Sequence, residues 1–187
     1  MAASTEDLFR RLDALGIVHL THHHPPLHRV AQSVALRGSL PGGHCKSLFL
    51  RDGKAGLWLV VVDEERQLDL KALAKHLGAP RFSFGSPALM QEVLGVTPGS
   101  VTPFALINDA ALRVTPVLDQ AMLEHHPLNY HPLVNTATTA VSAADLLRFI
   151  VACGHRPVVV AMDAFDRGGS LGGACQNEGR PPSLGDE

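Results

Sequence analysis

The sequence has few cysteines, and the three that it has stand far apart. Cys45, Cys153 and Cys175 form no CxxC pair, so neither a disulfide framework nor a zinc knuckle is indicated. The charge of the adjacent Lys46 could lower the pKa of the Cys45 thiol and make it reactive. The alternative, which we favour, is that Cys45 is a small residue that fills space in the core.

Long apolar runs and an excess of positive charge are also missing. Residues 57–62 form one of the longest apolar runs, which is far too short to span a bilayer. The N-terminus shows no signal-peptide pattern, so we expect a cytoplasmic protein with no membrane partner. With 16 Lys and Arg against 18 Asp and Glu, the formal net charge is −2. The scattered basic residues argue against a protein that wraps long nucleic acids, but a small footprint on a nucleic-acid end stays open.

The common catalytic signatures are absent as well. The chain contains no G-x-S-x-G elbow, no G-x-x-x-x-G-K-[ST] phosphate loop and no H-E-x-x-H motif. The histidines at 22–24 and at 125–126 invite a metal interpretation. Neighbouring strand residues point to opposite faces, however, and no Cys, Asp or Glu completes the first of these runs. We therefore expect no metal and no cofactor, and an enzyme of this kind would act by positioning its substrate and a water molecule.

The length of 187 residues and a hydrophobic content of 45% suit one domain with a real core. Periodicity and capping residues predict helices over 4–15, 30–36, 69–77, 86–95 and 143–153, and strands over 17–23, 46–51, 56–63, 104–107, 112–118, 136–141 and 157–161. The strands at 46–51 and 56–63 should form one hairpin, and those around 108–109 a second. This mixture predicts an α/β fold with a mixed, largely antiparallel sheet surrounded by helices. We assign the domain to residues 1–165 and a flexible tail to 166–187, where Gly, Pro, Ser and charge dominate.

The most distinctive segment is residues 95–103, Gly-Val-Thr-Pro-Gly-Ser-Val-Thr-Pro. It follows a predicted helix, and its two glycines and two prolines restrict the backbone to an unusual path. Such a rigid loop can present its own N–H and C=O groups to a small polar ligand. The alternative is a plain connector between two elements.

Two further features could belong to the same site. Lys46 opens a predicted strand and could anchor an anion, although an ordinary lysine with its stem on the core would look the same. His131 lies in the run 129–139, which is rich in apolar and hydroxyl residues, and could orient a ligand or transfer a proton. A purely structural histidine is equally compatible with the sequence.

Taken together, Lys46, the segment 99–103 and the run His-Pro-Leu-Val-Asn-Thr-Ala-Thr-Thr at 131–139 resemble the YbaK-type editing domains associated with prolyl-tRNA synthetase. The resemblance covers roughly residues 4–163, and the three motifs occur in the family order. It implies an α/β fold with a curved central sheet and a pocket at its mouth. The resemblance assigns the catalytic pocket to Lys46, Gly99, Ser100, Val101, Pro103 and His131, and substrate binding to Val30, Val34, Ser47, Thr102, Pro132, Asn135 and Thr136.

The resemblance also implies a reaction, which is hydrolysis of the ester that joins a wrong amino acid to the 3′ end of a tRNA. No protein nucleophile is needed: the loop backbone positions the aminoacyl group, and a ribose hydroxyl helps water to attack. Lys46 would hold the terminal nucleotide, and His131 would limit the size of the admitted side chain. The partners would be the 3′ end and acceptor stem of mischarged tRNA(Pro), with prolyl-tRNA synthetase or an elongation factor as further partners.

The chemistry of error correction agrees with alanine as the amino acid removed. A synthetase pocket built for proline loses only about 1–3 kcal/mol on binding a smaller apolar side chain, so a second and tighter sieve is required. A pocket walled by His131 and Val101, with Val30 or Val34, would admit alanine and exclude proline. A cysteinyl-tRNA deacylase, a non-catalytic nucleic-acid-binding module and a metal or redox protein are the alternatives.

Overall fold

The computed structural model describes residues 2–26 and 40–167. The predicted helix at 30–36, with the predicted pocket residues Val30 and Val34, lies outside these ranges, as does nearly all of the predicted tail. Asp166 and Arg167, the first two residues of that tail segment, contact the domain. The Asp166 carboxylate pairs with Arg66, and the Arg167 amide donates to the Gln67 carbonyl at 2.7 Å.

The fold is built on one eight-stranded mixed sheet, as the sequence predicts. Its strands are β1 (Leu20–His23), β2 (Gly43–Arg51), β3 (Leu57–Asp63), β4 (Ser83–Phe84), β5 (Val114–Asp119), β6 (Leu128–Tyr130), β7 (Ala137–Val141) and β8 (Val158–Val160). They follow the order β1-β7-β6-β2-β3-β5-β8, and β4 pairs with β2. The pairs β1–β7, β6–β7, β2–β3 and β2–β4 are antiparallel, and β2–β6, β3–β5 and β5–β8 are parallel.

The helices begin and end where the capping residues predict. They are α1 (Thr5–Ala14), α3 (Leu70–His76), α4 (Pro87–Leu94) and α5 (Ala143–Ala152), with the 3-10 turns η1 (Pro103–Asn108), η2 (Met122–Glu124) and η3 (Met162–Phe165). The side chains of Ser4, Asp69, Ser86 and Ser142 each accept a backbone N–H at a helix N-terminus. Gly95 ends α4 in the left-handed conformation, with φ 65°. No helix among the described residues is both long and apolar enough to cross a bilayer.

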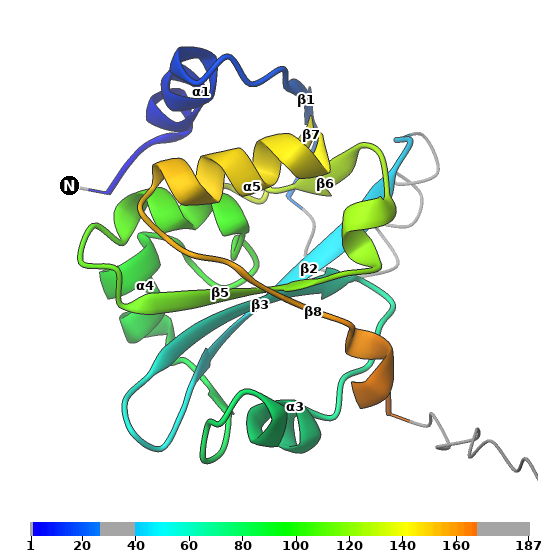
Figure 1. Cartoon of the computed structure of the whole chain (residues 1–187). Helices are drawn as coiled ribbons and strands as arrows, with labels where there is room; N and C mark the ends of the chain where they lie inside the picture. The colour runs from blue at the N-terminus through cyan, green and yellow to red at the C-terminus, as the bar shows by residue number, and fades with distance from the viewer. Residues whose placement is uncertain (1, 27–39, 168–187) are drawn as a thin grey trace, which may run out of the picture.

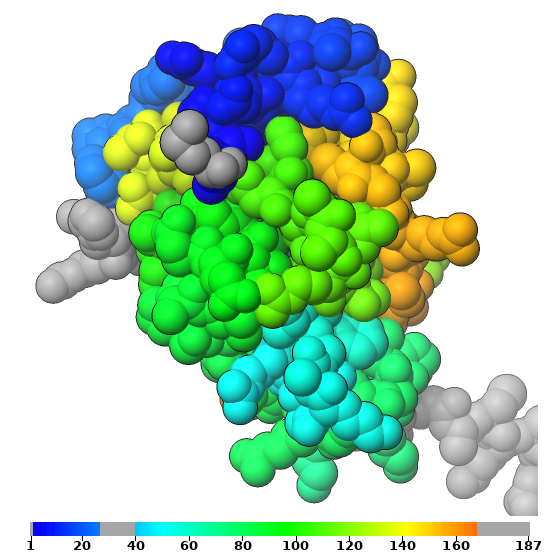
Figure 2. Space-filling model, turned by 90° about the vertical axis from the view of Figure 1, so that its left-hand side faces the viewer, coloured from blue at the N-terminus to red at the C-terminus, as the bar shows by residue number. Residues whose placement is uncertain are grey.

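The helices cover both faces of the sheet, and two cores result. Helices α1 and α5 lie on one side of the sheet and α3 on the other (Figure 1). The larger core centres on Phe104, whose ring meets those of Tyr130 and Phe149 edge to face at 5.9 and 5.4 Å. The smaller core packs α3 and η3 against β2, β3 and β5. In the space-filling view the N-terminal segment closes one end of the larger core, above the α4–η1 region (Figure 2).

The prediction of a second hairpin around Asn108 and Asp109 is wrong. Residues 103–108 form η1, and only β5 follows as a strand. Pro103 fits the first turn of a helix, and the Thr102 hydroxyl caps it by accepting the Phe104 amide at 3.3 Å. Residues 103–106 are all buried, which an alternating strand face does not allow. Burial of consecutive residues in the larger core therefore overrides their strand propensity.

The hairpin β2–β3 is confirmed, and it leaves an opening in the sheet. Strand β3 pairs with β2 from Cys45 to Arg51. On the other side of β2, β6 pairs only at Gly43 and His44, and β4 pairs only at Leu50 and Arg51. Among the described residues, no strand pairs with that side of β2 between these two short ladders. This unpaired stretch is the open edge of β2.

Candidate active site

The predicted loop is anchored at both ends and exposed in the middle. Gly95 ends α4, and the buried Thr102 caps η1. Between them, the buried Ser100 donates its amide to the Thr97 carbonyl at 3.0 Å, which closes a turn around Gly99. Gly99 is exposed, and its φ of 89° lies in a region that side chains with a Cβ avoid. The middle of the loop is therefore an exposed short turn whose backbone conformation requires the glycine at position 99.

The 131–136 segment lies against this turn. A Cβ on Gly99 would lie 4.0 Å from the Asn135 amide nitrogen. His131 is half-buried, and its Nδ1 bonds the Ala137 carbonyl at 2.9 Å. The Thr5 hydroxyl of α1 donates to the Pro132 carbonyl at 2.8 Å and ties the segment to the first helix. The structure thus brings together the second and third of the three predicted motifs, 99–103 and 131–136.

His24 joins this group, although the sequence did not single it out. Its Nε2 lies 2.9 Å from the Thr138 hydroxyl and its Nδ1 lies 2.9 Å from the Pro25 carbonyl. Its ring centroid is 6.2 Å from that of His131. The His-His-His-Pro-Pro run was the available signal, but it was considered only as a metal motif. No metal-binding group of three or more His, Cys, Asp or Glu side chains occurs in residues 2–26 and 40–167.

The side chains of Lys46 and Ser47, both in β2, point to opposite faces of the sheet. Lys46 pairs with Val62, which belongs to the smaller core, whereas Ser47 pairs with Val61 of the larger core. Val101 packs against the larger core, so the loop lies on the Ser47 side. A ligand that touches both Lys46 and the loop must therefore lie across the open edge of β2.

The Lys46 ammonium is held by the chain that follows β3. It donates a short hydrogen bond to the Arg66 carbonyl. Burial lowers the pKa of Lys46, and the nearby Glu64 carboxylate partly offsets this effect. Lys46 thus loses its proton at a lower pH than an ordinary lysine.

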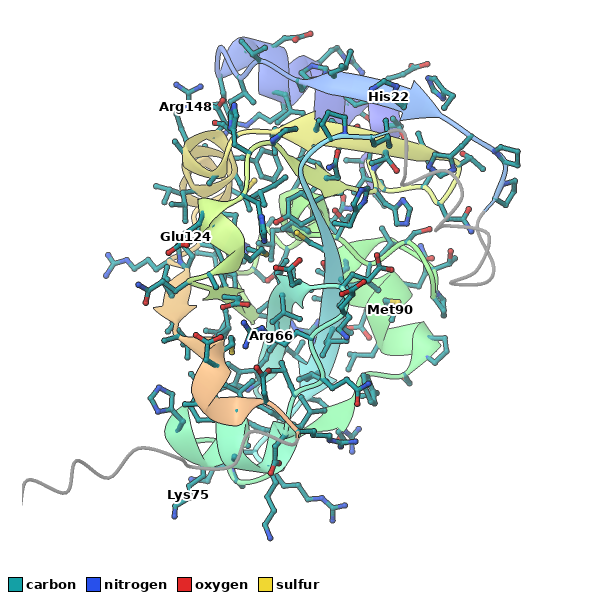
Figure 3. The ribbon with its side chains drawn as sticks, turned by 90° about the vertical axis from the view of Figure 1, so that its right-hand side faces the viewer. His22, Arg66, Lys75, Met90, Glu124 and Arg148 are labelled. Atoms are coloured by element: carbon teal, nitrogen blue, oxygen red, sulfur yellow. The ribbon has the colours of Figure 1, made fainter. Side chains whose placement is uncertain are left out.

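Arg66, which Figure 3 labels, is fixed by three carboxylates from the C-terminal half of the chain. Its guanidinium lies 3.0 Å from Asp119, 2.7 Å from Asp163 and 3.0 Å from Asp166. The Asp119 side chain is fully buried, and burial raises its pKa in spite of the attraction of Arg66. Arg66 therefore links β5 and η3 to the carbonyl that holds Lys46. A cleft beside it is lined by Gly42, Gly43, His44, Asp63, Glu64, Glu65, Arg66, Gln67, His125, Asp166 and Arg167.

The structure does not support a reactive Cys45. Burial raises the pKa of its thiol to about 12, and the hydroxyl of Tyr130 only partly opposes this. A thiol with such a pKa carries almost no thiolate at neutral pH. The interpretation of Cys45 as a space-filling residue fits its packing against the larger core.

Comparison with known proteins identifies the family. Residues 24–149 match the family described as the aminoacyl-tRNA editing domain. This chain belongs to that family. The matched range begins at His24 and contains Lys46, the loop and the 131–136 segment. Membership confirms, at the level of the family, the prediction of an aminoacyl-tRNA editing enzyme.

Two relatives and one solved structure illustrate the likeness. The prolyl-tRNA synthetase associated domain-containing protein 1 of Bos taurus is 40% identical over 161 residues, which cover 83% of this chain and 94% of the relative. The prolyl-tRNA editing protein ProX of Acetoanaerobium sticklandii is 32% identical over 146 residues, or 78% of this chain and 89% of the relative. A crystal structure described as a "putative trans-editing enzyme for prolyl tRNA synthetase" superposes with a TM-score of 0.66 at 20% identity, covering 90% and 99% of the two chains. This last likeness shows the shared fold.

We expect Arg66→Met to destabilise the protein strongly. Removing the guanidinium leaves the buried Asp119 carboxylate without its ion-pair partner, a loss of about 3–5 kcal/mol in the free energy of unfolding. Urea denaturation followed by circular dichroism measures this loss. Arg113→Met is the matched control, because Arg113 pairs with Glu92 on the surface and such pairs contribute about 1 kcal/mol or less. Equal losses in the two variants would show that the Arg66 cluster contributes no more than a surface pair.

Proposed function

We propose that this protein hydrolyses the ester of alanine mischarged onto tRNA(Pro), acting as a separate protein after the synthetase has released the tRNA. The observation that carries the proposal is the closeness of Asn135 to the Gly99 turn inside the matched editing domain, where a Cβ built on Gly99 would lie 4.0 Å from the Asn135 amide nitrogen. Relatives named for prolyl-tRNA editing and for association with prolyl-tRNA synthetase support proline as the tRNA identity.

The surroundings of the loop favour hydrolysis without a protein nucleophile. Cys45 is held as a neutral thiol, and both ring nitrogens of His24 contact protein oxygens. Ser100 is buried in the loop, where its amide closes the turn. The loop backbone is then left to position the aminoacyl carbonyl while water attacks it. The water oxygen bonds to the carbonyl carbon, the ester C–O bond breaks, and the ribose oxygen leaves with a proton.

Substrate choice would depend on the space between the loop and the 131–136 segment. Val101, in the loop, is partly buried and packs against the larger core, and the ring of His131 is held by the Ala137 carbonyl. A small cavity between these walls would accept a methyl side chain and reject the proline ring, which is the size rule of an editing sieve. Cysteine is only slightly larger than alanine, so Cys-tRNA(Pro) is the alternative substrate.

Lys46 would hold the 3′ end of the tRNA from across the open edge of β2. A phosphate near its ammonium replaces or shares the bond to the Arg66 carbonyl. The acceptor stem would contact little else, which suits a protein with a formal net charge of −2. We further propose that the protein docks on prolyl-tRNA synthetase or an elongation factor, which would keep it near the mischarged tRNA.

A panel of charged tRNAs tests the proposal. Purified full-length protein is mixed with Ala-, Cys- and Pro-tRNA(Pro) and with Ala-tRNA(Ala), and the remaining ester is counted over time. We expect Ala-tRNA(Pro) to be hydrolysed at least about tenfold faster than the others. Faster loss of Cys-tRNA(Pro) would favour the alternative substrate. Loss of none of them, together with binding of uncharged duplex that persists at physiological salt, would support a non-catalytic nucleic-acid-binding module instead.

The role of Lys46 predicts a pH dependence. Because burial lowers its pKa, the Lys46 ammonium is lost at a lower pH than that of an ordinary lysine, whose pKa is 10.5. The KM for the tRNA should therefore rise on the alkaline side, after subtraction of spontaneous hydrolysis. Lys46→Arg, which stays charged, should remove this rise, and Lys46→Ala should raise KM about 10- to 100-fold at neutral pH. An unchanged KM in Lys46→Ala would exclude the proposed contact.

The loop turn can be tested with two glycines of similar backbone conformation. Gly99 has φ 89° and Gly78, at the end of α3, has φ 70°, and a Cβ at Gly78 meets nothing within 4 Å. Each Gly→Ala change should cost about 1–2 kcal/mol of stability through the backbone alone. Only Gly99→Ala should also lower kcat/KM for the mischarged tRNA, by about tenfold or more, because its methyl group projects beside Asn135. A similar loss of kcat/KM in Gly78→Ala would mean that activity follows stability and not the loop.

A further inference from the structure

Phe84 is an aromatic residue that the fold leaves in water. The seven Phe, one Trp and one Tyr of the sequence all lie within the described residues. Of these nine aromatic side chains, only that of Phe84 is exposed, with 66% of its surface accessible to solvent. A ring with 66% of its surface exposed gains only a small part of the free energy that burial supplies, so packing within the fold does not explain it.

The position of Phe84 is nevertheless fixed. In β4, Phe84 pairs with Leu50 and Ser83 pairs with Arg51 of β2. The next amide, that of Gly85, donates to the Phe49 carbonyl at 2.9 Å. A Cβ on Gly85 would lie 2.5 Å from the Phe49 ring, so the chain here is packed closely against β2. Phe84 is thus presented by a hydrogen-bonded strand at the end of the open edge of β2.

Phe84 lies on the same sheet face as Lys46. Directly paired residues of an antiparallel ladder share a face, and so do alternate residues of one strand. Phe84 therefore shares its face with Leu50 and Lys46, but Leu50 is buried in the smaller core and Leu48 packs against it, so a strand between Phe84 and Lys46 must follow the edge of β2. Lys46 and Leu50 are four residues apart in β2. At about 3.3 Å per residue this separation is about 13 Å. Bases stacked at about 3.4 Å would need about four nucleotides to cover it, and an extended strand would need fewer, which matches the short unpaired 3′ segment of a tRNA.

The charges around Phe84 also suit a nucleic acid. Arg51 lies opposite Ser83, so its side chain leaves β2 on the face opposite that of Phe84, and Arg81 precedes Ser83 by two residues; both arginines are exposed. The nearby Asp52 carboxylate is occupied by the Trp58 indole and by the amides of its own turn. An exposed aromatic ring with positive charge on the other face of the same strands suits unpaired nucleotides that pass along the edge of a sheet.

We propose that Phe84 stacks on a base of the unpaired tRNA 3′ segment, a few nucleotides before the esterified end. The inference rests on the proposed function, since it assumes that Lys46 holds the terminal nucleotide. Phe84 would then keep the strand extended along the open edge of β2, beside the face formed by Leu48 and the buried Leu50. It would direct the end of the strand toward Lys46 and the Gly99 turn. Stacking accepts any base, so this contact would add affinity without reading sequence.

The test compares Phe84→Ala and Phe84→Trp with the wild type on two substrates. One is mischarged tRNA, and the other is the alanyl ester of adenosine, which has no upstream base. Phe84→Ala should raise KM for the tRNA about 5- to 100-fold with little change in kcat, and should leave the rate on the short ester unchanged. Phe84→Trp, which keeps an aromatic ring, should have a KM for the tRNA close to that of the wild type. Val151→Ala is the matched control, because Val151 is an apolar side chain on α5 with 59% of its surface exposed.

Unchanged KM in Phe84→Ala, or an equal loss on both substrates, would overturn the stacking role. Binding of an uncharged 3′ oligoribonucleotide, followed by fluorescence anisotropy, separates this failure from that of the proposed function. If the wild type binds the oligonucleotide, Phe84→Ala weakens binding and no ester is hydrolysed, the stacking site stands and the deacylase proposal fails. If the wild type hydrolyses the ester but binds the oligonucleotide no better than Phe84→Ala does, the deacylase proposal stands and the stacking site fails.

Discussion

The pairing of β2 with three other strands is the constraint on which the rest of the structure depends. Strand β3 holds one side of β2 along nearly its whole length, while β6 and β4 hold only the two ends of the other side. Among the described residues, no strand pairs with the middle of that side. An interrupted ladder in the centre of a sheet costs stability, because backbone groups there lose their partners. It also provides a place where a substrate can meet backbone groups inside a rigid frame.

Each part of the candidate site is held by an element far away in sequence. Lys46 depends on the Arg66 carbonyl, and the Arg66 guanidinium depends on carboxylates more than fifty residues later. Pro132 is tied to Thr5 in the first helix. These long-range ties let exposed segments keep a defined geometry without a large core of their own. The site is thus positioned by the whole domain, which explains why the matched family range spans most of the described chain.

The sequence predicted the parts of the fold that local chemistry determines. Asp52 closes the β2–β3 turn by accepting the amides of Lys54 and Gly56, and Ser86 and Gly95 bound α4; such signals act over a few residues. Residues 104–107 were expected to be a strand because their apolar run suits either structure, and only packing against Phe149 and Tyr130 decides for a helix. The parallel pairing of β3 with β5 and the Arg66 cluster had no local signal at all.

The candidate site shows the same division. The loop and the 131–139 run were found because their composition is unusual, and their contact through Gly99 and Asn135 follows from the fold. His24 was missed because its role comes from its distance to Thr138 and His131, which no spacing rule gives. Lys46 was found, but strand alternation places it on the face opposite Ser47, so its path to the loop runs across the edge of β2. A ligand that contacted both Lys46 and the loop would have to be thin and extended, which suits the unpaired RNA end of the proposed substrate better than a duplex or a folded protein surface.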